Sequence, residues 1–466
     1  MHWLKSRSFP IVGILVLGAI YAATQIEVYR DPRDVGTREN IRALAQREDL
    51  NLLFILIDTL RADHLGAYGY DRATSPGMDY LAEAGARFAN HRAQSSWTKT
   101  SMASLWTALH PAKTGVRRYD HGLPEAAEMP AEILRDAGFV TAGLWRNGWV
   151  APKFGFQQGF DLYHNPGVRQ TPKSLRREAR AGRIDGTDID IVYSGIEFMR
   201  THLDQRWFLY AHFMDVHQYV TVEDMAVFGN RYMDAYDNSI LWTDRQVMAL
   251  IGALEQLGLR ERTLVAIASD HGEAFGEHGR EGHAADLYGE TTLTPLILSF
   301  PFILEPGLVV ETASQNLDIW PTLLELLGAP PLSLADGRSL VPALVGDPPA
   351  PRLDIDVAQL DHGWGMIGAE PRSSVAIREG RLRYMRHEGR PNGDELYDLA
   401  QDPNEQVNLI ETSPEEAGEL RDRVIAEMEV ESIWQEGPDE VELDELSLRQ
   451  LRALGYSIQK PKPETN

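Results

Sequence analysis

The sequence predicts an α/β fold with a large, mostly parallel central sheet, followed by a small C-terminal α+β subdomain. Continuous apolar runs recur along the chain, as is typical of strands buried on both faces of a parallel sheet. Helical periodicity lies between these runs, for example at residues 77–86 and 244–257. This alternation of strands and helices, over about 250 residues, predicts a parallel sheet covered by helices. The apolar runs are residues 51–58, 139–145, 207–213, 264–270 and 295–300.

The C-terminal part has a different pattern. Residues 374–384 alternate apolar and polar side chains around a Glu-Gly pair, which predicts a hairpin with one solvated face. Acidic helical stretches follow. We therefore expect a main domain at 49–348 and a smaller α+β subdomain at 349–466.

The N-terminus has the composition of a membrane or export segment. An apolar run at residues 9–23 follows basic side chains at positions 5 and 7. The run suits either a short uncleaved anchor or a signal peptide, to which we assign residues 1–26. Residues 27–48 are charged and lack apolar periodicity, so we expect a linker. Basic residues ahead of the run predict that the main domain at 49–348 lies outside the cytoplasm, in the cell envelope.

Composition excludes several classes of function. The chain has 466 residues and a net charge of −24, from 69 acidic and 45 basic side chains. This balance argues against nucleic acid as a partner, because phosphate neutralisation needs a basic surface. The sequence has no cysteine, which excludes disulfides, iron–sulfur clusters, zinc–thiolate sites and a cysteine nucleophile.

Ligand-type side chains follow several predicted strands. Asp58 ends the first apolar run, Asp270 and His271 end another, and Asp215 with His217 follows a third. Open α/β sheets bind ligands at the carboxyl ends of their strands. These residues, which are far apart in sequence, are therefore expected to converge at one edge of the sheet.

A hydroxyl-rich segment at residues 95–111 supplies a candidate nucleophile. Its second half has helical spacing, which places Thr98 to Ser101 at a helix N-terminus. One interpretation is a helix cap, since Ser and Thr are preferred there. The other is that Thr98 is a nucleophile beside helix N–H groups that can hold phosphate or sulfate. The segment by itself leaves both interpretations open.

Several motifs together resemble the sulfatase family. The similarity runs in the family's order from about residue 50 to residue 456, and it implies the alkaline-phosphatase-like α/β sandwich. The motifs with the chemistry-bearing residues are Leu56-Ile-Asp58-Thr-Leu-Arg61, Trp97-Thr98 through Pro111, Ser269-Asp270-His271-Gly272 through Gly279, and Gly282-His283 through Glu290.

The chain departs from that family at the residues that decide the chemistry. Thr98 stands where sulfatases carry the cysteine or serine that becomes formylglycine, so no formylglycine is expected. Met102 replaces an arginine that supports formylglycine, and Thr59 replaces a second aspartate ligand. His283 stands where a lysine is expected, and Arg146 is a candidate substitute for another.

These changes are similar to another branch of the superfamily, which includes phosphoethanolamine transferases and lipoteichoic-acid synthases. In that branch a threonine is the nucleophile and one divalent metal ion is bound. The resemblance implies a metal site made of Asp58, Thr98, Asp270 and His271. Carboxylates with one imidazole suit Ca²⁺, Mg²⁺, Mn²⁺ or Zn²⁺. A bound cation would lower the pKa of the threonine hydroxyl.

Further polar residues are candidates for proton transfer and substrate binding. His217 is expected to protonate the leaving oxygen and then activate water, and His278 or His283 could share that work. Three basic residues are candidates for neutralising substrate oxygens: Arg61, Lys99 and Arg146.

The leading hypothesis is a metal-dependent, sulfatase-like hydrolase of sulfuric or phosphoric esters. Phosphoesters are favoured on mechanism, because a Thr98 sulfate lacks the easy collapse that formylglycine provides. One alternative is a membrane-anchored phosphoryl or phosphoethanolamine-type transferase acting on envelope glycans or lipids. Another is an inactive sulfatase-like binding protein. Expected partners are a small-molecule, glycan or lipid ester and, through the N-terminal segment, a membrane; the sequence predicts no particular oligomeric state.

Overall fold

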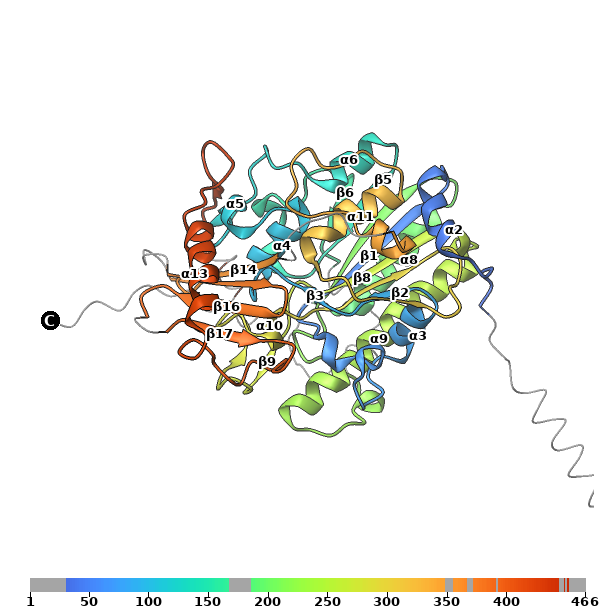
Figure 1. Ribbon diagram of the computed structural model, residues 1–466. Helices are drawn as coiled ribbons and strands as arrows, with labels where there is room; N and C mark the ends of the chain where they lie inside the picture. Colours follow the sequence, from blue (N-terminus) through green and yellow to red (C-terminus); the bar gives the residue numbers. More distant parts are fainter. Residues whose placement is uncertain are drawn as a thin grey trace, which may run out of the picture. The chain divides into compact units, whose positions relative to one another are not determined.

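A large β-sheet forms the centre of the molecule in the computed structural model (Figure 1). The structure describes residues 31–166, 186–347, 355–366, 372–390, 393–443, 448 and 451. The sheet has eight strands in the order β12-β2-β11-β8-β1-β7-β5-β6. In chain order they are β1 (Asn51–Ile57), β2 (Ala86–Phe88), β5 (Val140–Leu144), β6 (Leu162–His164), β7 (Trp207–Phe213), β8 (Thr263–Ala268), β11 (Leu296–Ser299) and β12 (Leu308–Val310).

All neighbouring strands of this sheet run parallel except at β11, which is antiparallel to both β8 and β2. The predicted α/β class with a mostly parallel sheet is therefore confirmed. Strand β1 lies between β7 and β8, and all its residues are buried. Its side chains alternate between two hydrophobic cores, with Leu52, Phe54 and Leu56 in one and Leu53 and Ile55 in the other.

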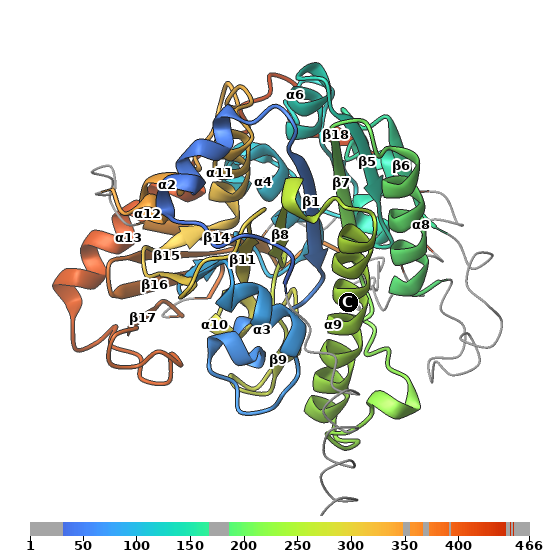
Figure 2. The same ribbon diagram turned by 90° about the vertical axis from the view of Figure 1, so that its right-hand side faces the viewer.

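Helices cover both faces of the sheet (Figures 1 and 2). The core that contains Phe54 includes apolar side chains of α4, α6 and α11, and the core that contains Ile55 includes those of α3, α8 and α9. Because both faces are covered, β1 has no polar face, which explains its continuous apolar run. These six helices are α3 (Pro76–Glu83), α4 (Thr98–Thr107), α6 (Pro130–Asp136), α8 (Asp188–Thr201), α9 (Tyr232–Gln256) and α11 (Ile319–Leu326).

The C-terminal part contains a second, antiparallel sheet in the order β14-β15-β16-β17. Its predicted hairpin is formed by β15 and β16, which turn at Gly380 with a positive φ of 58°. Helix α13 packs on this sheet through a small apolar cluster. The elements are β14 (Ile355–Asp361), β15 (Ser373–Glu379), β16 (Leu382–His387), β17 (Glu395–Asp398) and α13 (Pro414–Met428).

Shorter elements complete the described part of the chain. The short helices are α2 (Arg38–Ala43), α5 (Pro111–Thr114), α10 (Gly289–Thr292) and α12 (Val341–Val345). The two-stranded pairs are β3 (His91–Arg92) with β13 (Ser314–Gln315), β9 (Ala274–Phe275) with β10 (Glu281–Gly282), and β4 (His121–Gly122) with β18 (Asp439–Glu440).

The structure differs from the sequence predictions in two segments. Residues 38–46, expected within a linker, form α2 and a 3-10 turn, and their Ile41 and Leu44 belong to the main core. Two buried apolar side chains were too few to show periodicity. Helix α9 begins at Tyr232, ahead of the predicted start at 244. The apolar periodicity did not show its first half, because that half buries polar side chains such as Asp237 and Asn238.

The predicted anchor or signal peptide at residues 1–26 lies outside the described residues, as does the predicted boundary between the main domain and the C-terminal subdomain at 348 and 349. Within the ranges that the structure describes, no helix combines the length and the apolarity that crossing a membrane requires.

Candidate active site

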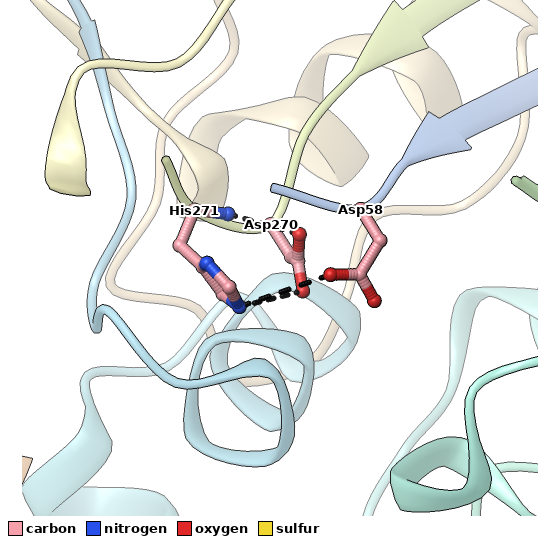
Figure 3. A group of neighbouring side chains, drawn as sticks. All are labelled: Asp58, Asp270 and His271. Carbon is pink, nitrogen blue, oxygen red and sulfur yellow. Dashed lines mark hydrogen bonds and ion pairs between the residues drawn. The ribbon is translucent and has the colours of Figure 1, made fainter. Parts of the chain in front are cut away.

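Three potential metal ligands meet at the carboxyl ends of two neighbouring parallel strands. Asp58 follows β1, while Asp270 and His271 follow β8 (Figure 3). Their ligand atoms all lie within 4.8 Å of one another, and all three residues are buried. His271 Nε2 is 3.3 Å from Asp270 Oδ2 and 4.0 Å from Asp58 Oδ1. The expected convergence therefore occurs because parallel strands end at a common edge.

Thr98 lies at the same edge, at the first position of α4. The residue before it, Trp97, holds the N-cap position, so Thr98 is not the helix cap. Its Oγ1 is 3.1 Å from His271 Nε2. Ser101, one turn later, donates to the backbone carbonyl of Asp270 at 2.5 Å and so ties α4 to the end of β8.

Two polar residues that the sequence analysis did not single out hold Asp58. Asn147 Nδ2 donates to Asp58 Oδ2 at 2.6 Å and lies 3.4 Å from Thr98 Oγ1. His212 Nε2 is 3.2 Å from the same Oδ2, and its Nδ1 is 2.7 Å from the Tyr210 hydroxyl. With the proton on Nε2, the ring donates to Asp58 and accepts from Tyr210. His212, a polar residue within the apolar run 207–213, was the available sequence signal.

Asp270 is fixed by backbone donors rather than by side chains. Its Oδ1 accepts from the N–H of Thr59 at 3.2 Å and from its neighbour His271 N–H at 3.0 Å. Thr59 adopts a φ of +62°, which is unfavourable for a β-branched residue. The Thr59 hydroxyl donates to the Asp58 carbonyl at 2.6 Å. The strain at Thr59 thus accompanies a backbone conformation that aims an N–H at the Asp270 carboxylate.

The remaining oxygens of the two aspartates suit a cation. Asp58 Oδ1 and Asp270 Oδ2 are buried and accept no hydrogen bond from any residue that the structure describes. Burial and then the charge of Asp58 raise the pKa of Asp270 to about 8. Burial also acts to raise the pKa of Asp58, but His217, His212 and His271 outweigh it and lower that pKa. Two buried carboxylates and one imidazole, with two oxygens lacking donors, fit one divalent metal ion.

Two further histidines lie beside His271. The ring centroids of His271 and His283 are 4.7 Å apart, and those of His217 and His283 are 4.9 Å apart. His283 Nδ1 pairs with Glu273 Oε2 at 3.1 Å. Burial acts to lower the pKa of His283, but Glu273 outweighs it and raises that pKa. Burial lowers the pKa of His217 to about 4. The structure therefore brings His217 and His283 next to the potential metal ligands, as expected.

Two of the expected substrate-binding residues are engaged in other interactions. Lys99 is buried and donates to the carbonyls of Tyr119 and His121 at 2.6 and 2.8 Å. Burial lowers its pKa well below the usual lysine value. Arg146 donates to Asp188 and Asp215 at 2.7 and 2.6 Å. The sequence shows that these residues are basic, but not that their charges are used inside the fold.

Arg61 and His278 pair with acids other than the potential metal ligands. Arg61 pairs with Asp63 at 2.7 Å and with Glu277 at 2.5 Å. It lines a cavity of about 390 Å³ whose lining includes none of Asp58, Thr98, Asp270 and His271. His278 Nδ1 is 2.7 Å from Glu290, and its ring stacks on Tyr288 with the centroids 3.7 Å apart.

Comparisons with known proteins agree with this geometry. Residues 50–329 match the sulfatase family model, and residues 276–431 match the C-terminal model of N-sulphoglucosamine sulphohydrolase. Human arylsulfatase A is 27% identical over 85% of this chain and 91% of its own length. Choline-sulfatase of Rhizobium meliloti is 26% identical over 78% of this chain and 82% of its own.

Among solved structures, the phosphonate monoester hydrolase of Agrobacterium radiobacter has a similar fold. Its TM-score is 0.67 at 20% identity, covering 84% of this chain and all of that chain. The first family model alone spans more than half of the chain. The architecture and the converging acids define an alkaline-phosphatase-like α/β protein. Within that superfamily, the chain belongs to the sulfatase family.

Proposed function

We propose that this chain is a metal-dependent hydrolase of phosphoric or sulfuric esters, in which Thr98 is the nucleophile. The observation that carries the proposal is the position of Thr98 Oγ1, 3.1 Å from His271 Nε2, which itself lies 3.3 Å from Asp270 Oδ2 and 4.0 Å from Asp58 Oδ1. Neither of these buried oxygens accepts a hydrogen bond from the part of the chain that the structure describes. Membership of the sulfatase family supports ester hydrolysis. We propose that Asp58, Thr98, Asp270 and His271 hold one divalent cation, which would lower the pKa of the Thr98 hydroxyl when bound.

The protein's own side chains account for the remaining steps. Thr98 Oγ1 attacks phosphorus or sulfur, and the bond to the leaving oxygen breaks as the Thr98 ester forms. The leaving oxygen gains one proton, and Thr98 loses one. Water then cleaves the Thr98 ester and restores the hydroxyl. We assign the proton transfers to His217, which is partly exposed, and to His283, which is oriented by Glu273.

Asn147 and His212 support this chemistry by orienting Asp58 and Thr98. The Asn147 amide contacts both Asp58 Oδ2 and Thr98 Oγ1, which restricts the rotamers of both side chains. Such supporting hydrogen bonds fix the direction of ligands and nucleophiles.

Phosphoric esters are the better substrates on chemical grounds. The second half-reaction for a Thr98 sulfate requires water to attack sulfur, since threonine has no second hydroxyl through which sulfate could be expelled. The similarity to arylsulfatase A favours sulfate esters instead. Substrate class is therefore the quantity to measure first.

The test is an assay panel on the full chain. The substrates are p-nitrophenyl sulfate, p-nitrophenyl phosphate and bis(p-nitrophenyl) phosphate, each with Mg²⁺, Mn²⁺, Ca²⁺ or Zn²⁺. We expect metal-dependent turnover in which a phosphoester exceeds the sulfate. Turnover of the sulfate alone would contradict the phosphoester preference.

Thr98→Ala tests the nucleophile and should lower kcat/KM by at least about 10³-fold. Thr100→Ala is a matched control, because the Thr100 hydroxyl donates to the Val116 carbonyl at 3.0 Å. Intact-mass analysis of the wild type during turnover should show one phosphoryl group on Thr98. Wild-type activity in Thr98→Ala would reject Thr98 as the nucleophile.

A further inference from the structure

A buried ion-pair network lies next to the candidate active site, at the ends of β5 and β7. Arg146, two residues after β5, donates through Nη1 to Asp188 Oδ1 at 2.7 Å and to Asp215 Oδ1 at 2.6 Å. Its Nη2 donates to the Gly186 carbonyl at 2.7 Å and to Gln218 Oε1 at 3.0 Å. The two aspartates are fully buried, so the network is shielded from solvent.

The Asp188 carboxylate accepts hydrogen bonds from the segment after β7 and not from the N–H groups of its own helix. Asp188 is the first residue of α8, yet its Oδ1 accepts from Met214 N–H at 2.8 Å and its Oδ2 from Asp215 N–H at 2.9 Å. The N-terminus of α8 has another acceptor, since Asp190 accepts from Thr187 N–H at 3.0 Å. The Asp188 carboxylate is therefore used to hold the segment after β7 rather than to cap its own helix.

Asp215 closes the network from the other side. Its Oδ2 accepts from Asp188 N–H at 3.1 Å and from Trp242 Nε1 of α9 at 2.9 Å. The chain after β7 forms a tight turn, in which Gln218 N–H donates to the Met214 carbonyl at 3.2 Å and Val220 N–H to the Asp215 carbonyl at 2.9 Å.

His217 lies within this turn, one residue before Gln218. The turn is held at Met214 and Asp215 by Asp188, and at Gln218 by Arg146. Both ends of the short segment that carries His217 are therefore fixed by the same network. The His217 ring reaches His283 with a centroid distance of 4.9 Å.

We propose that Asp188 is a positioning residue, which holds the turn at residues 214–218 so that His217 stays beside His283 for proton transfer. The inference rests on the proposed function, because it requires His217 to act in ester hydrolysis. It does not depend on whether Thr98 is the nucleophile or on which ester is the substrate. Misplacing a reacting group by about 1 Å can cost about 100-fold in rate.

The experiment is a double-mutant cycle on the full chain with its metal, using the p-nitrophenyl ester that turns over fastest. Asp188→Asn removes one of the two acceptor oxygens and is expected to lower kcat by about 10- to 100-fold with little change in KM. In the His217→Ala background, Asp188→Asn should lower kcat no further. This non-additivity is a result that a merely structural role would not give.

Asp244→Asn is the matched control. Asp244 is a buried aspartate of α9 that likewise accepts from two backbone N–H groups, those of Gly77 at 2.9 Å and Met78 at 2.7 Å. It lies on the other side of α9 from Trp242, which belongs to the Asp215 network. We expect Asp244→Asn to lower the melting temperature as Asp188→Asn does, while kcat stays within about 2-fold of the wild type.

If Asp188→Asn does not fold, Gln218→Ala replaces it in the cycle, because it removes only one acceptor of Arg146 and leaves the buried charges paired. A kcat effect that is additive with His217→Ala overturns the inference alone. Unchanged kcat in Asp188→Asn, with His217→Ala impaired, also overturns it alone. Unchanged kcat in His217→Ala overturns both the inference and the proposed role of His217, whereas Thr98→Ala tests the nucleophile separately.

Discussion

Two pairs of buried aspartates lie at the carboxyl edge of the central sheet, and they differ in how their oxygens are satisfied. In the pair Asp188 and Asp215, every carboxylate oxygen accepts a hydrogen bond from a described partner. In the pair Asp58 and Asp270, one oxygen of each accepts none from the described part of the chain. The first pair is completed by Arg146, whereas no arginine or lysine among the described residues pairs with the second.

The pKa shifts alone would not separate these pairs. Burial first, and the neighbouring carboxylate second, raise the pKa of Asp270 to about 8 and that of Asp188 to about 7. Both shifts follow from placing two acids together in a region of low polarity. The hydrogen-bond partners make the distinction, because a buried oxygen without a donor costs free energy unless a cation binds there. This difference supports the proposed positioning role of the first pair and the proposed metal binding by the second.

The largest effect is expected at the candidate metal site. Asp270→Asn removes a carboxylate ligand and should lower kcat/KM by at least about 10³-fold, since metal ions contribute several kcal/mol to transition-state stabilisation. The second measurement does not depend on activity. Added Mn²⁺ should raise the melting temperature of chelator-treated wild type, because a ligand that binds only the folded state stabilises it.

The same cation should leave the melting temperature of Asp270→Asn unchanged. Asp188→Asn is the control, because it alters the other pair and should keep the metal-dependent rise. An undiminished rise in Asp270→Asn would show that the cation binds elsewhere, and the contrast between the two pairs would fail.

A smaller effect, on stability, is expected when Asp188 and Asp215 lose the positive charge of Arg146. Arg146→Met leaves Asp188 and Asp215 buried without a positive partner and should lower the free energy of unfolding by about 3–5 kcal/mol at pH 8. Arg200→Met, which breaks an exposed pair with Glu197 on the same helix, should change it by less than about 1 kcal/mol.

The loss of unfolding free energy in Arg146→Met should depend on pH. The folded-state pKa of Asp188 is raised to about 7 from its ordinary value of 3.8, so its stabilising contribution is full below pH 3.8 and is lost as pH rises through 7. Removing Arg146 raises this pKa further. Urea unfolding at pH 5.5 and pH 8 should therefore show the larger deficit at pH 8; an equal deficit at both values would argue that Asp188 does not titrate in the variant.

The sequence predicted the parts of this comparison that depend on local patterns. The apolar run at 207–213 coincides with β7, because a strand buried on both faces is apolar over nearly all of its length, here with His212 as the polar exception. Asp58, Asp270 and His271 were predicted to converge because parallel strands end together. The resemblance to a superfamily branch with a threonine nucleophile implied that these residues form a metal site together with Thr98.

Two kinds of contact could not be predicted from the sequence, because they depend on tertiary geometry. These are the contacts that orient the potential metal ligands and the contacts that neutralise two of the expected substrate-binding residues. His212 reaches Asp58 because β1 and β7 pair in the register that sets Leu56 beside His212, and a single sequence does not specify register between distant strands. Arg146 and Lys99 were expected to bind substrate oxygens, since a sequence shows charge but not the partners that neutralise it. Their partners are two aspartates for Arg146 and two backbone carbonyls for Lys99.

The smallest effect on stability is expected at a buried base. His91 is buried, with Nδ1 2.9 Å from Ser314 Oγ and Nε2 2.8 Å from Asn316 Oδ1. Burial lowers its pKa to about 4 from the ordinary value of 6.5. Like those of Asp188 and Asp215, its polar atoms have hydrogen-bond partners, and burial favours the neutral form of the ring.

The burial of this ring predicts a loss of stability in acid. The unfolded chain takes up a proton near pH 6.5 and the folded protein only near pH 4, so the contribution of His91 is full above pH 6.5 and is lost as pH falls towards 4. At pH 5 the loss is about 2 kcal/mol. His91→Gln should remove this component from the difference in unfolding free energy between pH 7 and pH 5, whereas His164→Gln, at an exposed position, should not. If both variants keep the wild-type difference, burial does not hold the His91 ring in its neutral form.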